Sequence, residues 1–174
     1  MIKTETVSTA RLDLVPLSVE HADEMAVVLG DPNLHAFTGG SPSTAEELSE
    51  RYERQVGGSP NPAVSWLNLV LRLRDEDCLV GYVQSTVRPA DGADGDVAEI
   101  AWVVGTPWQR RGLAAEAAKG LADWLAQQPT VKTIIAHIQP DHQASAAVAA
   151  AAGLTPTEEW VDGEIKWQRE IAAI

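Results

Sequence analysis

Hydrophobic and polar residues alternate along several segments of the chain, a pattern typical of β-strands that bury one face. The alternation predicts strands at 11–17, 63–73, 78–87 and 97–105. A nearly continuous apolar run at 131–138 predicts a buried strand, and residues 158–171 predict a terminal hairpin with Asp162 and Gly163 at its turn. Three of the strands follow one another through short connections, which favours antiparallel pairing.

Two segments in the first third of the chain repeat apolar residues at the spacing of an amphipathic helix. Ser18 is placed to cap the first of these helices, which we expect to end at Gly30. Ser43 with Glu46 predicts a capping box that opens the second helix, which runs to about Val56.

Two further helices are predicted at 112–127 and 143–153. The first of them is amphipathic, so it should bury one face and leave the other in solvent. We expect its buried face to hold Leu113, Ala117, Leu121, Trp124 and Leu125, and its exposed face Glu116, Lys119, Asp123 and Gln127. The order of strands and helices predicts an α/β fold around a mixed sheet.

Composition narrows the class of protein. The 174 residues fit a single domain over 1–174, and the net charge of −12 disfavours nucleic acid or an anionic membrane as a partner. No apolar run reaches the ~18 residues of a membrane span, and residues 1–12 lack the core of a signal peptide. Cys78 is the only cysteine, so it cannot form an intrachain disulfide, and we expect a buried structural thiol in a cytoplasmic protein.

The segment 107–125, PWQRRGLAAEAAKGLADWL, places two arginines and a glycine directly before a predicted helix. The first turn of a helix has unpaired backbone N–H groups and partial positive charge. Arg110 and Arg111 add donors for phosphate oxygens, and Gly112 lets the backbone approach a ligand closely. The spacing is not that of a Walker A loop or a dinucleotide fingerprint. It predicts an anion site, although a helix that merely follows a polar loop would carry similar residues.

The run from Gln109 to Ala114 resembles the Gln/Arg-x-x-Gly-x-Gly/Ala signature of the GNAT acyltransferase superfamily. Residues 9–32, 98–117 and 137–154 look like successive parts of its ribosomal-protein N-terminal acetyltransferase branch, so the resemblance covers nearly the whole chain. It implies a GNAT-like, mostly antiparallel sheet flanked by about four helices, with acetyl-CoA in a cleft between splayed strands.

The resemblance also implies which residues bind acetyl-CoA. The loop and the first helical turn would grip the pyrophosphate, through Gln109, Arg110, Arg111, Gly112, Leu113, Ala114 and Ala115. A backbone N–H of Val103 or Val104 would stabilise the developing oxyanion. His142 replaces the family's asparagine and would either contact the cofactor or cap the helix from Gln143, and Ser145 would contact the departing sulfur.

Two departures from the family pattern bear on catalysis. Ala149 stands where many members carry a tyrosine that protonates the leaving thiolate, and Leu154 replaces a phenylalanine. Tyr52 and Tyr82, the only tyrosines, lie elsewhere in the sequence. A thiol with a pKa of about 8.5 is already a tolerable leaving group, so the missing tyrosine need not abolish activity.

The implied reaction is acetyl transfer to a primary amine, which requires a group that accepts the ammonium proton. Glu99 occupies the position where many relatives keep that base; the alternative is a solvent-facing strand glutamate. His137 should be structural, since it lies on a buried strand. With His142 it lacks the further ligands of a zinc site, so no metal is expected.

The resemblance leaves the acceptor open between a protein N-terminus and a small-molecule amine. It also leaves open whether the protein is a monomer or a homodimer. A non-catalytic acyl-CoA-binding module is the alternative from another class, and Ala149 favours it, whereas Glu99 and Ser145 favour an enzyme.

Overall fold

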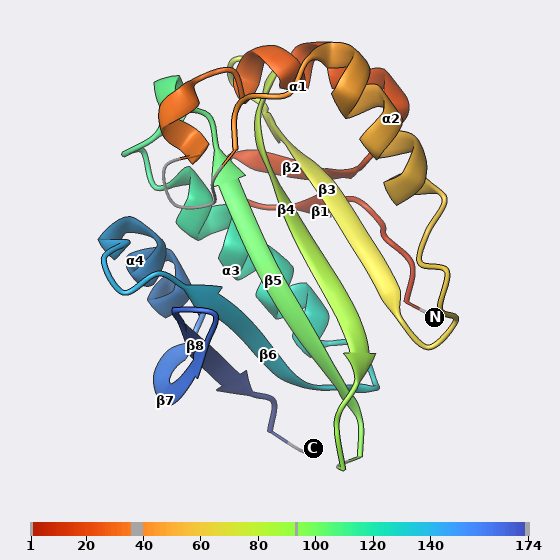
Figure 1. Ribbon diagram of the computed structural model, residues 1–174, viewed down its shortest axis with the longest axis vertical. Helices are drawn as coiled ribbons and strands as arrows, with labels where there is room; N and C mark the ends of the chain where they lie inside the picture. The colour runs from red at the N-terminus through yellow and green to blue at the C-terminus, as the bar shows by residue number, and fades with distance from the viewer. Residues whose placement is uncertain (1, 36–39, 93, 173–174) are drawn as a thin grey trace.

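The computed structural model describes residues 2–35, 40–92 and 94–172 (Figure 1). Within these ranges eight strands form one sheet, in the order β1-β2-β3-β4-β5-β6-β8-β7. The strands are β1 (Val7–Ser8), β2 (Leu12–Pro16), β3 (Ser65–Leu73), β4 (Cys78–Pro89), β5 (Asp96–Val104), β6 (Val131–Ile138), β7 (Thr155–Val161) and β8 (Glu164–Glu170). Neighbouring strands are antiparallel except for β5 and β6, which are parallel. The predicted α/β fold with a mixed, mostly antiparallel sheet is confirmed.

The helices lie close to their predicted positions. They are α1 (Ala22–Val28), α2 (Ala45–Val56), α3 (Leu113–Ala126) and α4 (Gln143–Ala151), with 3₁₀ turns η1 (Val19–His21), η2 (Pro32–His35) and η3 (Thr106–Trp108). Sequence reasoning missed β1, η2 and η3, because segments of two to four residues are too short to show a periodic pattern, and it predicted η1 as part of the first helix. The terminal hairpin is confirmed, with Asp162 and Gly163 both at positive φ, as a type I′ turn requires.

One of the two predicted N-cap residues lies one position away from the observed N-cap. Ser18 caps as predicted, although it opens a 3₁₀ turn rather than an α-helix. The prediction for α2 is wrong: Thr44 is the N-cap, and it exchanges hydrogen bonds with Glu47. Ser43 and Glu46 fit the same four-residue pattern one position earlier, so the sequence alone does not separate the two registers.

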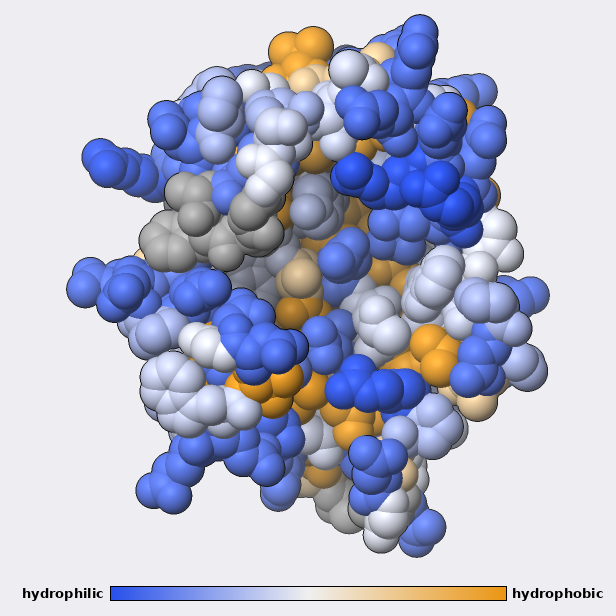
Figure 2. Space-filling model, viewed as in Figure 1, coloured by the Kyte–Doolittle hydropathy of each residue, from blue (hydrophilic) through white to orange (hydrophobic). Residues whose placement is uncertain are grey.

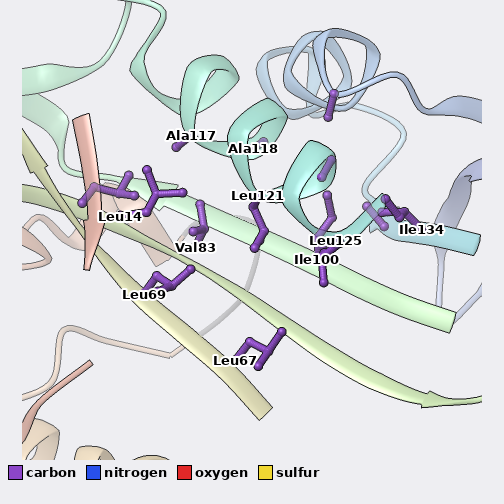
Figure 3. Close-up of a cluster of buried hydrophobic side chains, with 14 of the residues drawn as sticks. Leu14, Leu67, Leu69, Val83, Ile100, Ala117, Ala118, Leu121, Leu125 and Ile134 are labelled. Atoms are coloured by element: carbon purple, nitrogen blue, oxygen red, sulfur yellow. The ribbon is translucent and has the colours of Figure 1, made fainter. Parts of the chain in front are cut away.

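Helix α3 packs its apolar face on one face of the sheet (Figure 3). Its residues Leu113, Ala117, Leu121 and Leu125 are at most 1% exposed, as predicted, whereas Trp124 is only partly buried. The strand residues in this core include Leu14, Leu67, Leu69, Val83, Ile100 and Ile134. The core therefore fixes which face of each strand is buried.

The opposite face of the sheet is only partly covered. Helices α1 and α2 pack over β3 and one end of β4, in a cluster that contains Met25, Leu48, Tyr52, Val70 and Leu79. In Figure 1 this face points toward the viewer, with α3 behind the sheet, and Figure 2 shows that its centre is hollowed below the two helices. We call it the open face.

Strands β5 and β6 pair over only part of their length. Their parallel register runs from Asp96 opposite Val131 to Glu99 opposite Ile135. Beyond that point β5 pairs only with β4 and β6 pairs only with β8, so among the described residues no strand pairs with the edges of 100–104 and 136–138 that face each other. We call this divergence the fork.

Candidate active site

Glu99 lies on β5 at the last paired position before the fork. Its side chain, 40% exposed, is on the open face, because its neighbours Ala98 and Ile100 are buried in the core with α3. Glu99 Oε1 is 3.4 Å from Arg88 Nη1 and 3.6 Å from His137 Nδ1. The half-exposed carboxylate therefore has a guanidinium and an imidazole as neighbours.

His137 reaches this site from β6, on the other arm of the fork. The prediction that His137 lies on a buried strand is correct, since Ala136 and Ile138 on either side are buried, but the histidine itself faces Glu99. Sequence reasoning did not connect the two residues because the register of β5 against β6 is a tertiary property. Alternation did indicate that His137 points away from its buried neighbours.

A pocket of about 530 Å³ opens beside Glu99. It is lined by Arg88, Glu99, Ile135, His137, Glu159, Trp160, Val161 and Lys166. The last four of these residues come from the terminal hairpin, where Trp160 is 58% exposed. The pocket thus gives a ligand access to the fork from the open face.

The loop between β5 and α3 contains two residues with a left-handed backbone conformation. Arg110 has φ of 64°, and Gly112, the N-cap of α3, has φ of 77°. Turns that contain left-handed residues direct successive N–H groups toward one side in the anion-binding concavities of proteins. A Cβ on Gly112 would meet only Arg11 Nη2, at an ordinary 3.4 Å, so left-handed φ rather than crowding by the protein requires glycine here.

Side-chain contacts connect this loop to β5 and to the turn between β3 and β4. Gln109 Nε2 donates to the carbonyl oxygen of Val104 at 3.0 Å, which joins two residues that sequence reasoning assigned to the site. Arg111 Nη2 lies 2.8 Å from Glu76 Oε2, in the turn between β3 and β4. This contact holds the pKa of Glu76 below its usual range, mainly through the hydrogen bond from Arg111. The side chain of Arg111 is thus held in place at the surface.

Arg11 is a loop-anchoring residue that sequence reasoning missed. Its Nη1 donates to the carbonyl oxygen of Arg111 at 2.8 Å, and its Nε donates to Glu116 Oε1 at 2.8 Å. Glu116 also accepts from Thr9, so its prediction as a solvent-facing residue is wrong. Burial alone would raise the pKa of Glu116, but the hydrogen bonds from Thr9 and Arg11 outweigh burial and lower it.

The first turn of α3 offers a ligand backbone groups and small side chains. Leu113 is 1% exposed and points into the core, so only its backbone can face a ligand. Ala114 and Ala115 are half-buried and keep the turn slim. Together with Arg110, Arg111 and Gly112, this turn presents backbone N–H groups and cationic side chains at a helix start, which are groups that bind phosphates in proteins.

At the start of α4, His142 is the N-cap, which is one of its two predicted roles. Its Nδ1 accepts from the backbone N–H of Ser145 at 3.3 Å, and its Nε2 is 3.2 Å from Ser145 Oγ. Burial lowers the pKa of His142, so the ring is neutral at pH 7. Ala149 is fully buried, so its small side chain belongs to the core in this chain.

No cluster of three or more His, Cys, Asp or Glu side chains in 2–35, 40–92 and 94–172 could hold a metal ion. In the same part of the chain, no helix has the length and apolar character needed to cross a membrane. Cys78 is half-buried rather than fully buried, and burial raises the pKa of its thiol.

Solved structures with this fold include several acetyltransferases. An acetyltransferase (GNAT family) from Bacillus anthracis is 18% identical, with a TM-score of 0.75 over 95% of this chain and 98% of that chain. RimL, a ribosomal L7/L12 alpha-N-protein acetyltransferase in complex with coenzyme A, is 15% identical, with a TM-score of 0.75 over 96% and 98%. AAC(6')-Ib, in complex with "Parmomycin" and acetyl-CoA, is 18% identical, with a TM-score of 0.72 over 92% and 93%. No curated protein matches the sequence.

The family model of the acetyltransferase (GNAT) domain matches residues 11–155. The matched region includes the fork, the loop before α3 and the start of α4. It therefore supports acetyl-CoA as the cofactor, as the sequence predicted. Since the match covers most of the described chain, the protein belongs to the GNAT acetyltransferase domain family.

Proposed function

We propose that the protein transfers the acetyl group of acetyl-CoA to a primary amine. The observation that carries the proposal is the combination of the fork with the left-handed loop at Arg110 and Gly112, which offers an unpaired strand edge next to an anion site. The acceptor class is either a protein N-terminus, as the name of RimL suggests, or a small-molecule amine.

Different groups of the protein bind different parts of acetyl-CoA in this proposal. Arg110, Arg111 and the N–H groups of the first turn of α3 bind the pyrophosphate. The edge of β5 beyond Glu99 binds the pantetheine arm as an added strand would bind, through its backbone. An N–H of Val103 or Val104 faces the thioester oxygen and stabilises negative charge there. Acetyl-CoA supplies the electrophilic carbonyl and a thiolate leaving group.

Glu99 is the proposed base for the amine. It lies at the vertex of the fork, where the open face meets the unpaired strand edge. Arg88, next to it, disfavours a bound ammonium ion and so assists loss of the proton. His137 contacts the same carboxylate oxygen and can hold Glu99 in place or pass the proton on. Ser145, already paired with neutral His142, is the proposed hydrogen-bond donor to the sulfur.

A thiol-release assay tests the proposal. Acetyl-CoA is mixed with the protein and with peptides, amino acids, polyamines or aminoglycosides, and free coenzyme A is measured. We expect release that depends on one class of amine. Binding of acetyl-CoA without release for any amine would support the alternative, a non-catalytic acyl-CoA-binding module, which is consistent with the buried Ala149.

A further inference from the structure

A second cavity, of about 220 Å³, lies on the open face between the sheet and helices α1 and α2. Its lining combines leucines with polar side chains from α2, β3 and β4. The polar ones are Arg51, Tyr52, Gln55, Asn68, Tyr82 and Gln84. We call it the tyrosine cavity. Nothing in the proposed chemistry at Glu99 uses these residues.

Most of the polar groups in the tyrosine cavity have no partner in the protein. Among the described residues, none donates a side-chain hydrogen bond to, or accepts one from, the side chains of Tyr52, Gln55, Asn68, Tyr82 or Gln84. Tyr52 is buried and the other four side chains are half-buried, and the polar atoms of all five still contact solvent in the cavity. These hydrogen-bonding groups are therefore available to a polar ligand.

The two phenol groups are neutral donors. Tyr52 is 5% exposed, and burial, with a smaller contribution from Tyr82, raises its pKa to about 12. Burial also raises the pKa of Tyr82. Both hydroxyls therefore keep their protons at pH 7 and can donate to an acceptor atom in the cavity.

Charge in the tyrosine cavity has one sign. Of the described residues that line it, Arg51 is the only charged one and no carboxylate is present, although the chain as a whole carries −12. Arg51 Nη2 donates to Ser43 Oγ at 2.9 Å, which orients the guanidinium and leaves its other N–H groups for a ligand. A ligand with an oxyanion suits this lining, whereas a second ammonium group does not.

The tyrosine cavity is close enough to Glu99 for one molecule to reach both. On the paired strands β4 and β5, Gln84 is opposite Ala101, and Thr86 is opposite Glu99. One strand spacing and two residues of rise separate the Cα atoms of Gln84 and Glu99 by about 8 Å. A ligand with its amine at Glu99 therefore reaches the tyrosine cavity at Gln84 over a Cα separation of about 8 Å.

We propose that the tyrosine cavity binds the distal end of the acceptor, and that the acceptor is an amine that carries an oxyanion, either a carboxylate or a phosphate, which pairs with Arg51. This inference rests on the proposed function, because it assumes that the amine lies at Glu99. It narrows the acceptor class and disfavours polyamines and other purely cationic amines.

Calorimetric binding in the presence of coenzyme A tests the inference without requiring turnover. The probes are 5-aminopentanoate, 3-aminopropyl phosphate, pentylamine and 1,5-diaminopentane. We expect one of the two oxyanion probes to bind roughly tenfold more tightly than pentylamine, the lower range for a charge-assisted hydrogen bond. The better of the two identifies carboxylate or phosphate as the oxyanion.

Paired variants assign the effect to Arg51. Arg51→Gln should remove the preference for the oxyanion probe, and Arg54→Gln, on the next turn of α2 and outside the cavity lining, should retain it. Pentylamine or the diamine binding as tightly as both oxyanion probes would overturn the inference, and so would equal losses in the two variants. Oxyanion binding without thiol release would instead contradict the proposed transferase and leave the cavity assignment standing.

Discussion

Replacing Gly112 with alanine should separate the role of this residue in the loop backbone from any role in general stability. Gly112 has φ of 77°, where an L-residue is strained by about 1–2 kcal/mol. The built Cβ meets nothing closer than Arg11 Nη2 at 3.4 Å, so strain is the only cost expected in the protein alone. At roughly 2–4 °C per kcal/mol for a domain of this size, the melting temperature should fall by about 2–8 °C.

The effect on acetyl-CoA should exceed this loss of stability. Relaxation of the strained φ would redirect the N–H groups at the start of α3, which are proposed to bind the pyrophosphate. We expect at least about tenfold weaker binding, the loss of roughly one charge-assisted hydrogen bond. Isothermal titration calorimetry measures the affinity, and the shift in melting temperature with added acetyl-CoA gives an independent value.

Gly58→Ala is the matched control. Gly58 has φ of 83°, and nothing lies within 4 Å of the position of a Cβ there. An alanine at this site, in the loop after α2 and away from α3, would therefore carry the same backbone strain. The control should lose similar stability and keep its affinity for acetyl-CoA. If Gly112→Ala also kept its affinity within about twofold while it lost stability, the residue would be structural and the assigned pyrophosphate site would be wrong.

Four further predictions use other groups. Glu99→Gln should lower kcat by roughly 10²–10⁴-fold in a pH–rate profile, and the deficit should shrink between pH 7 and 9, because the neutral fraction of an amine with a pKa of about 10 rises from ~0.1% to ~10%. Ser145→Ala should lower kcat less, with a deficit that does not shrink in this way; equal pH dependence of the two variants would contradict the separate roles. In urea unfolding, Glu116→Gln should cost about 1.5 kcal/mol at pH 7. Since the folded pKa of Glu116 is lowered, that cost should vanish as the pH falls through it; a pH-independent cost would contradict the ionised carboxylate. Phenolate absorbance should appear only above pH 10, and near pH 12 for Tyr52. The free energy of unfolding should fall over the same pH range, because the tyrosines of the unfolded chain ionise at a pH of about 10. Titration near pH 10 would show that Tyr52 and Tyr82 are solvated.

The sequence predicts what depends on local periodicity and misses what depends on pairing between distant segments. The buried face of α3 follows from spacing alone, because residues three and four apart share one side of a helix. Glu116 lies at a polar position of the same pattern, but its partners Thr9 and Arg11 come from the N-terminal part of the chain. Similarly, alternation turns His137 away from its neighbours, yet only the register of β5 against β6 brings it to Glu99.

Strand β5 contributes to the core, to the proposed acetyl-CoA site and to the proposed acceptor site, because each of them involves a different side of the strand. Ile100 and Val104 point into the core with α3, Glu99 points to the open face, and the backbone edge beyond Glu99 faces the fork. A register slip of one residue would move Glu99 into the core and expose Ile100, so the core fixes the position of the proposed base. The end of the strand is fixed as well: the N–H of Gly105 donates to the carbonyl oxygen of Val80 at 2.7 Å, and a Cβ on Gly105 would lie only 2.8 Å from a backbone oxygen of Val28. The same contacts that stabilise the sheet therefore set where the loop before α3 begins and how far it lies from Glu99.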